Sequence, residues 1–91
     1  MSTETLNDEL LEVVKESIQE HNLILFNDHV NTFDHVIDLL MKVCDHDAIQ
    51  AEQCATLVHY AGKCAVKKGS FDELAKMHEV LADNGLTVEI N

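Results

Sequence analysis

The stretch NLILFNDHVNTFDHVIDLL, residues 22–40, decides the expected fold because an apolar run typical of a strand is followed in it by apolar residues at helical spacing. Residues 22–26 are a short apolar run, and residues 27–29 (NDH) have side chains typical of a turn, which together indicate a buried strand closed by a polar turn. Asn31 or Thr32 can then cap a helix. The apolar residues of that helix recur on one face, at Phe33, Val36, Ile37, Leu40 and Cys44.

A second helix and a second strand are expected next along the chain. Asp47 can cap a helix that runs to about Tyr60, and Gly62 is well placed as the helix-ending residue. Residues 63–67 alternate weakly in polarity and are interpreted as a strand. The apolar stripe of the helix comprises Ala51, Cys54, Ala55 and Val58, with His59 at its edge.

A capping box marks the start of the third helix, with Ser70 as the N-cap and Glu73 three residues later. Asn84-Gly85 ends this helix, and residues 86–90 alternate cleanly as a last strand. The expected buried side of the helix is formed by Phe71, Leu74, Met77 and Leu81. The element order is β-α-α-β-α-β, so we expect an α+β fold in which a three-stranded antiparallel sheet packs against three helices.

The sequence also predicts a separate N-terminal segment, residues 1–21, in front of a compact domain formed by residues 22–91. Apolar residues recur in the segment at four-residue steps, at Leu6, Leu10, Val14 and Ile18. This pattern is typical of an amphipathic helix, but such a short helix is marginal outside a core. The segment is therefore expected to be either helical or flexible.

Charge and hydropathy restrict the partners and the compartment. Six basic and seventeen acidic residues give a net charge of −11, which repels phosphate backbones and anionic lipid and favours a cationic group on a partner. No run approaches the roughly 20 apolar residues of a membrane span. The first residues, MSTET, lack the basic and apolar regions of a signal peptide. We therefore expect a cytoplasmic protein that binds neither nucleic acid nor membrane.

The three cysteines, Cys44, Cys54 and Cys64, are interpreted as buried reduced thiols. Their number is odd and no C-x-x-C pair occurs, which argues against a disulfide framework and a zinc ribbon. Cys44 and His46 lie close in sequence, but no recognisable ligand spacing accompanies them. No metal and no cofactor is expected.

Two places in the sequence could carry a binding site. Asn27 and Asp28 end a strand, where they either form an ordinary turn or project from the rim of the sheet. His59 is either a core or capping residue, or it faces Asp28 beside an apolar slot. A carboxylate, an amide oxygen and a neutral imidazole are acceptors suited to the donors of an ammonium group. No nucleophile motif accompanies them, so no catalytic residue and no enzyme activity are expected.

Two motifs carry a resemblance to the ClpS adaptor family. LILFND at residues 23–28, followed by NTFDHVIDLL at 31–40, resembles the opening of that family, and AEQ at 51–53 with VHYAGK at 58–63 resembles its second-helix signature. The resemblance implies a β-α-α-β-α-β adaptor. Such an adaptor binds substrates that begin with Phe, Leu, Tyr or Trp, which are N-degrons, and delivers them to a Clp AAA+ unfoldase and its protease.

The resemblance also implies which residues bind the substrate. Carried over by position, Asn27, Asp28 and His59 hold the α-amino group and the first peptide unit. His29 and Asn31 are candidate residues at the mouth of the site. The side-chain pocket implied by the family comprises Leu25, Phe33, Val36, Ala55, Val58 and Leu86.

This sequence departs from the family pattern at three places. His29 stands where a second acidic residue is common. Phe33 and Ala55 stand where methionines are frequent, so one pocket wall gains bulk and the opposite wall loses it. The segment between Gly62 and Met77 is short and lacks the A-E-T-K-like stretch that helps dock the unfoldase in the family. Residues that could dock the unfoldase instead are Lys67, Lys68 and Asp72.

Two other hypotheses remain open from the sequence. One is an interaction domain of the same fold that acts through its N-terminal helix, without recognising N-termini. The other is a metal- or thiol-dependent function around Cys44 and His46. The first predicts no preference for a free N-terminal residue, and the second predicts a bound ion or thiol-sensitive activity.

Overall fold

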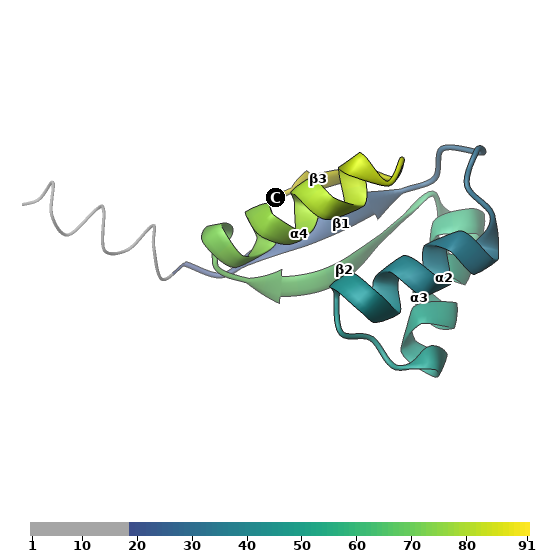
Figure 1. Ribbon diagram of the computed structural model, residues 1–91, viewed down its shortest axis with the longest axis horizontal. Helices are drawn as coiled ribbons and strands as arrows, with labels where there is room; N and C mark the ends of the chain where they lie inside the picture. Colours follow the sequence, from purple (N-terminus) through teal and green to yellow (C-terminus); the bar gives the residue numbers. More distant parts are fainter. Residues whose placement is uncertain (1–18) are drawn as a thin grey trace, which may run out of the picture.

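Strand β1 (His21–Phe26) is the central strand of a three-stranded antiparallel sheet in the computed structural model, which describes residues 19–91 (Figure 1). Its neighbours are β2 (Lys63–Gly69) on one side and β3 (Thr87–Ile90) on the other. The described elements follow the order β-α-α-β-α-β. The α+β fold predicted from the sequence is therefore confirmed.

The helices begin at the residues that their caps predict. The Thr32 side chain accepts from His35 N–H at the start of α2 (Phe33–Val43), and Asp47 accepts from Gln50 N–H at the start of α3 (Ala48–Ala61). Ser70 caps α4 (Phe71–Asp83) with the predicted capping-box contact to Glu73. Helix α3 ends at Gly62, whose φ of 92° is left-handed and suits a residue without a Cβ.

A bulge in β2 makes this strand longer than the predicted residues 63–67. Leu23 pairs with Lys67 and Ile24 pairs with Ala65, so Val66 is an extra residue between the two pairs. Val66 is buried, and Lys67 Nζ donates to the Cys44 carbonyl at 3.1 Å. The bulge therefore lets β2 contribute a core residue and also a link to the end of α2.

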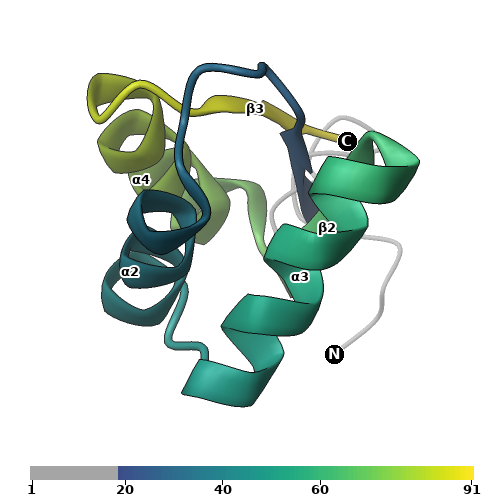
Figure 2. The same ribbon diagram turned by 90° about the vertical axis from the view of Figure 1, so that its right-hand side faces the viewer.

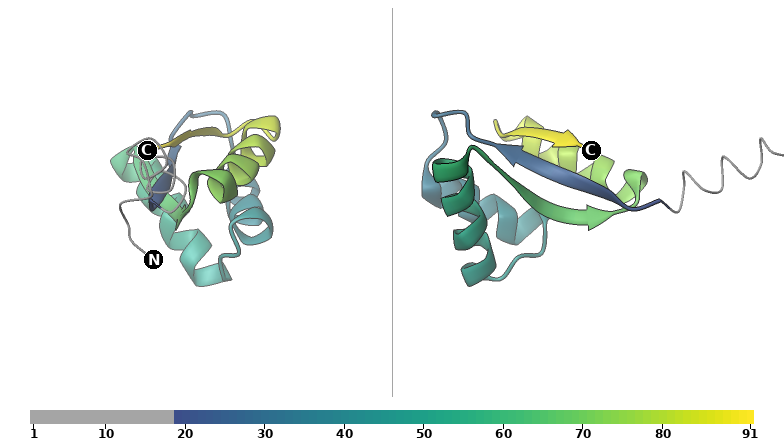
Figure 3. Two further views of the ribbon diagram at one scale, coloured as in Figure 1. Left: turned by 90° about the vertical axis from the view of Figure 1, so that its left-hand side faces the viewer. Right: turned by 180° about the vertical axis from the view of Figure 1, so that it is seen from behind.

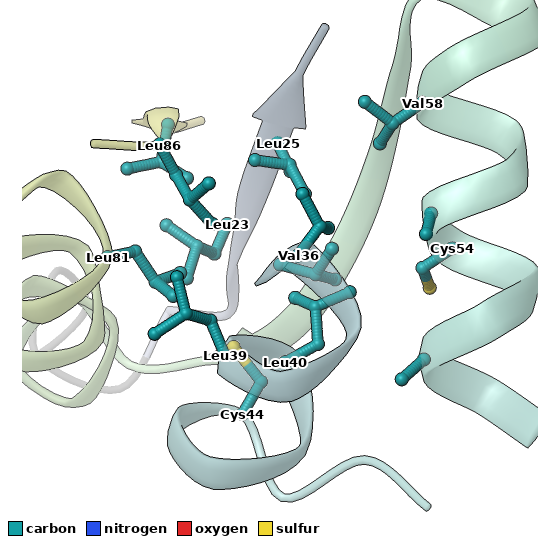
Figure 4. Packing of buried hydrophobic residues seen from close by; sticks show 14 of the residues in the cluster. Leu23, Leu25, Val36, Leu39, Leu40, Cys44, Cys54, Val58, Leu81 and Leu86 are labelled. Carbon is teal, nitrogen blue, oxygen red and sulfur yellow. The ribbon is translucent and has the colours of Figure 1, made fainter. Parts of the chain in front are cut away.

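The helices leave one face of the sheet open. Leu23 and Leu25 of β1 are fully buried, whereas Ile24 and Phe26, which point to the other face, are half-buried. In the end-on view of Figure 2, α2 and α3 lie side by side and α4 lies behind α2. In Figure 3 (right) the three strands lie in front of α2 and α4. Leucines from the strands and helices thus form one core between the sheet and the helices (Figure 4).

Several expectations about burial need correction. Phe33 and Phe71 were expected to face the core, but they are 40% and 52% exposed. Each is the first residue of its helix, where fewer neighbouring turns cover the side chain. Leu39 is buried although it was not assigned to the core face. Cys44 and Cys54 are buried thiols as expected, whereas Cys64 is only half-buried.

His46 is a buried polar residue that the sequence pattern did not place in the core. Its Nε2 bonds the Val66 carbonyl, which can only accept, so Nε2 carries the hydrogen and Nδ1 is left as the acceptor. Nδ1 has no partner among the described residues. The ring thus joins the loop between α2 and α3 to the bulge of β2.

Three further expectations concern the N-terminal segment, a membrane-spanning helix and a metal site. The amphipathic pattern from Leu6 to Ile18 lies outside the described residues. Within residues 19–91, no helix is long and apolar enough to span a membrane. The same part of the chain holds no group of three or more histidine, cysteine or acidic side chains arranged to bind a metal ion.

Candidate functional site

A pocket opens where the end of β1, the start of α2 and the last turns of α3 meet. It is apolar at its base and polar on one side of its mouth. Its lining residues are Leu25, Phe26, Asn27, Asp28, Asn31, Phe33, Val36, Ala55, Val58, His59 and Leu86. All residues carried over from the family to the α-amino site and the apolar pocket are in this set, and Asn31 is as well.

The apolar walls come from four separate parts of the chain. Leu25, Val36, Ala55, Val58 and Leu86 are all buried members of the hydrophobic core. In Figure 4, Leu25, Val36, Val58 and Leu86 lie above Leu39 and Leu40, at the end of the core that borders the pocket. The pocket is therefore an unfilled continuation of the core, and an apolar side chain that entered it would leave water.

Asp28 is the most densely bonded side chain of the rim. Its Oδ1 accepts from the backbone N–H of Val30 at 3.0 Å and of Asn31 at 3.2 Å. Its Oδ2 accepts from Asn31 Nδ2 at 2.6 Å and from the Thr87 hydroxyl at 3.5 Å. Partial burial raises the pKa of Asp28, but these donors together outweigh it and hold the pKa below its usual value. The group is therefore a fixed carboxylate at neutral pH.

Asn27 is fixed at the rim by both its backbone and its side chain. Its N–H donates to the Gly62 carbonyl at 3.0 Å, which ties the end of β1 to the end of α3. Its Oδ1 accepts from His29 N–H at 3.2 Å, as in an Asx turn. The tie to Gly62 brings Asn27 and His59 to one pocket although they are distant in sequence.

His59 lines the same pocket from the last turn of α3. Its ring is exposed and contacts the Phe33 ring at a centroid distance of 5.4 Å. None of the hydrogen bonds between described residues uses the imidazole nitrogens of His59. The imidazole is therefore held by ring packing with Phe33.

His29 does not line the pocket. It is exposed and has a left-handed backbone with φ of 62°, which directs the chain around the turn. Of the two candidate mouth residues, only Asn31 is among the residues that line the pocket.

The sequence did not reveal three residues that complete the rim. Phe26 adds to the lining, Thr87 donates to Asp28, and the Gly85 carbonyl accepts from Asn31 Nδ2 at 2.9 Å. Phe26 and Thr87 are cross-strand partners in the β1–β3 register. No local sequence pattern gives that register, which is why Thr87 and Gly85 were not found.

The geometry describes a binding domain with a bipartite pocket. An apolar base can take a hydrophobic side chain, while a carboxylate, a side-chain amide and an imidazole line the mouth. No cysteine, serine or lysine is among the lining residues.

Comparison with known proteins identifies the family. The family model for the ATP-dependent Clp protease adaptor protein ClpS matches residues 16–89. ATP-dependent Clp protease adapter proteins ClpS are similar to this chain: that of Thermosynechococcus vestitus is 32% identical over 85% of this chain and 83% of its own length. That of Synechocystis sp. is 30% identical over 89% of this chain and 84% of its own length. The chain therefore belongs to the ClpS family of Clp protease adaptors.

A solved structure supports the fold independently. Agrobacterium tumefaciens ClpS2, solved bound to L-phenylalaninamide, superposes with a TM-score of 0.69 over 80% of this chain and 95% of that chain. The two are 15% identical in sequence, so this likeness concerns the fold.

Proposed function

We propose that this protein is an N-degron adaptor that binds substrates whose first residue is Phe, Leu, Tyr or Trp. The first side chain enters the apolar pocket, and the α-ammonium group lies against Asn27, Asp28 and His59. In the proposal the adaptor then delivers the substrate to a Clp AAA+ unfoldase for degradation. It acts by binding alone, without catalysis, in the cytoplasm.

The observation that carries the proposal is the position of Asp28 beside an open apolar pocket. A fixed carboxylate at the mouth favours a cation, and the adjoining base favours an apolar side chain. A bulky N-terminal residue supplies both groups within a few ångströms. An internal residue with the same side chain lacks the charged amine and cannot pair with the rim carboxylate, which gives the discrimination. The phenylalaninamide bound to Agrobacterium ClpS2 is a ligand of the same chemistry.

Burial of the first side chain supplies part of the affinity, about 1.5–3 kcal/mol for a leucine or phenylalanine. The amine adds charge-assisted hydrogen bonds, which contribute about 1.5–3 kcal/mol each when they are buried and less at this half-open mouth. Both contributions to the affinity come from residues that are already held in place in the unbound chain. Little ordering is needed on binding, which favours affinity.

The direct test is fluorescence anisotropy with peptides labelled at the C-terminus. Matched peptides begin with Phe, Leu, Tyr, Trp, Val or Ser, and each is compared free and N-acetylated. The proposal expects binding of the free bulky residues, loss of at least tenfold on acetylation, and little binding of Ser. Equal affinity for free and acetylated peptides would exclude recognition of N-termini and favour an interaction domain that uses another surface.

Delivery requires a surface that docks the unfoldase. The candidate residues for this surface are Lys67, Lys68 and Asp72. Lys67 is half-buried and its amino group bonds the Cys44 carbonyl, so it holds the fold together. Lys68 and Asp72 are exposed on either side of the β2–α4 connection. We assign docking to these two residues, and a pull-down of the N-terminal domain of a Clp unfoldase with Lys68→Glu and Asp72→Lys variants tests it. Undiminished capture by both variants would move docking elsewhere.

A further inference from the structure

A row of three aromatic rings runs outward from the mouth of the pocket. Phe33 lines the pocket and contacts His59 at a centroid distance of 5.4 Å with the rings tilted by 57°. His59 in turn contacts Tyr60 at 4.8 Å in a T-shaped arrangement. Tyr60 itself is outside the pocket lining. The row therefore begins inside the pocket and ends on the surface.

These rings are exposed to an extent that the fold does not require. Tyr60 is 81% exposed and Phe33 is 40% exposed. Isolated exposed apolar residues need no explanation, but a continuous row that joins a pocket indicates a binding surface. Because the first ring of the row is itself a pocket wall, the surface and the pocket are continuous.

The proposed function fixes which part of a ligand reaches this row. When the first side chain fills the pocket and the amino group lies at Asn27, Asp28 and His59, the peptide leaves past the mouth. Consecutive residues advance about 3.4 Å and their side chains alternate in direction, so the second side chain points away from the pocket base. His59 belongs both to the rim and to the row, and the second side chain therefore lies near the rings that flank it.

We infer that the Phe33–His59–Tyr60 row is a subsite for the second residue of the substrate and that it favours an aromatic side chain. This inference rests on the proposed function. The three rings present both edges and faces, and aromatic rings prefer offset or edge-to-face contact with one another. The contact also shields the Phe33 and Tyr60 rings from water.

The expected selectivity follows from the usual strength of ring contacts. One aromatic pair adds a free energy that corresponds to roughly a two- to tenfold gain in affinity. A peptide that begins Phe-Phe should therefore bind about two- to tenfold more tightly than one that begins Phe-Ala. An arginine can also stack on such rings, so Phe-Arg is the appropriate competitor.

The test measures anisotropy with four free peptides that differ only at the second position: Phe-Ala, Phe-Phe, Phe-Tyr and Phe-Arg. Each is titrated with the wild type, with Tyr60→Ala and with Ile49→Ala. Ile49 is a matched control because it is also on α3 and is 72% exposed, but it lines neither the pocket nor the row. Circular dichroism confirms that the variants keep their helices.

The subsite predicts that Phe-Phe and Phe-Tyr bind more tightly than Phe-Ala to the wild type and to Ile49→Ala. In Tyr60→Ala the ratio of the Phe-Phe affinity to the Phe-Ala affinity should shrink toward one. Loosening of the His59 ring weakens all four peptides alike and leaves this ratio unchanged. Equal affinity for all four peptides, a preference that survives Tyr60→Ala, or tightest binding of Phe-Arg would overturn the aromatic subsite and leave the N-degron proposal intact. Failure of all four to bind would overturn both.

Discussion

The side-chain amide of Asn31 donates to Asp28 Oδ2 at 2.6 Å and to the Gly85 carbonyl at 2.9 Å. One NH₂ group therefore bridges the turn after β1 and the turn between α4 and β3. The Thr87 hydroxyl reaches Asp28 Oδ2 from β3, the strand that follows the second of these turns. The rim carboxylate is thus positioned by a part of the chain more than fifty residues away.

Asn31→Ala should destabilise the domain because it removes both bonds of the bridge. Hydrogen bonds to charged groups contribute about 1.5–3 kcal/mol, and the half-buried position of Asn31 places the expected loss near the lower value. Urea denaturation followed by circular dichroism measures the loss. Gln53→Ala is a suitable control, since Gln53 is an exposed amide on α3 and its removal should change stability by less than about 0.5 kcal/mol. Equal stability of both variants would mean that the bridge contributes nothing.

The bridge also shows which features the sequence could predict. Thr32, Asp47 and Ser70 cap helices through bonds to residues three positions later. Local spacing therefore predicted the starts of the second and third helices, and it predicted the start of the first to within one residue, since Asn31 and Thr32 were both candidates. The contacts of Asp28 with Thr87 span fifty-nine residues and depend on the register of β3 against β1. Register comes from packing of the whole sheet, and no single stretch of sequence contains it.

Prediction of the site depended on a family resemblance more than on periodicity. Alternation and helical spacing identified Leu25, Val36 and Val58 as core residues, but they did not show that the core is open at that end. Phe33 illustrates the difference. Helical spacing assigned it to the buried face, whereas its family position assigned it to the pocket, where it is found with 40% of its surface exposed.

Replacement of Asp28 by asparagine should change how stability depends on pH. The folded-state pKa lies below the ordinary value of 3.8, because the donors of Val30, Asn31 and Thr87 outweigh the opposing effect of partial burial. The ionised carboxylate therefore contributes stability that is present above the unfolded-state pKa and is lost as the pH falls through the folded-state pKa.

The measurement is urea unfolding of the wild type and Asp28→Asn at a series of pH values. The wild type should be the more stable protein at pH 6, and its advantage should begin to shrink below about pH 5, when the unfolded-state carboxyl starts to bind its proton. Asparagine keeps an acceptor for the two backbone N–H groups but places an NH₂ group where Asp28 Oδ2 accepts from Asn31 and Thr87. The pH dependence of the stability difference, and not its size, therefore reports the charge. If the stability advantage of the wild type grew as the pH fell, folding would raise the pKa of Asp28 and not lower it.

The three cysteines should differ sharply in reactivity. Burial raises the pKa of Cys44 to about 11, against a smaller lowering by Lys67. Burial and the neighbouring Cys64 thiol raise the pKa of Cys54 to about 12, so at pH 8 Cys54 is almost entirely a protonated thiol. Cys64 is half-buried and more accessible than the other two. Alkylation of the native protein should therefore modify Cys64 first.

A short pulse of iodoacetamide followed by peptide mass mapping tests this order. Cys44 and Cys54 should be modified at an appreciable rate only when urea unfolds the chain, and the unfolded sample is the control for intrinsic reactivity. Labelling of Cys54 as fast as Cys64 in the native protein would show that the space between α3 and β2 opens readily.

Two alanines one turn apart on α3 test whether the pocket is open in solution. Ala51 and Ala55 are both buried, but only Ala55 lines the pocket. Ala51→Leu should overpack the closed core and cost about 1–3 kcal/mol. Ala55→Leu can place its added atoms in the pocket, so we expect a smaller loss of stability than for Ala51→Leu.

The same pair should have the reverse effect on binding. The new leucine of Ala55→Leu occupies the space meant for the first side chain of the ligand, and loss of that burial weakens a Phe-initiated peptide by about tenfold or more. Ala51→Leu leaves the pocket walls unchanged, so the folded fraction should bind as the wild type does. Urea denaturation measures the stability of both variants, and fluorescence anisotropy measures their affinity for the peptide. If Ala55→Leu is destabilised as much as Ala51→Leu, the pocket is closed in the free protein and a ligand has to open it, at a cost in affinity.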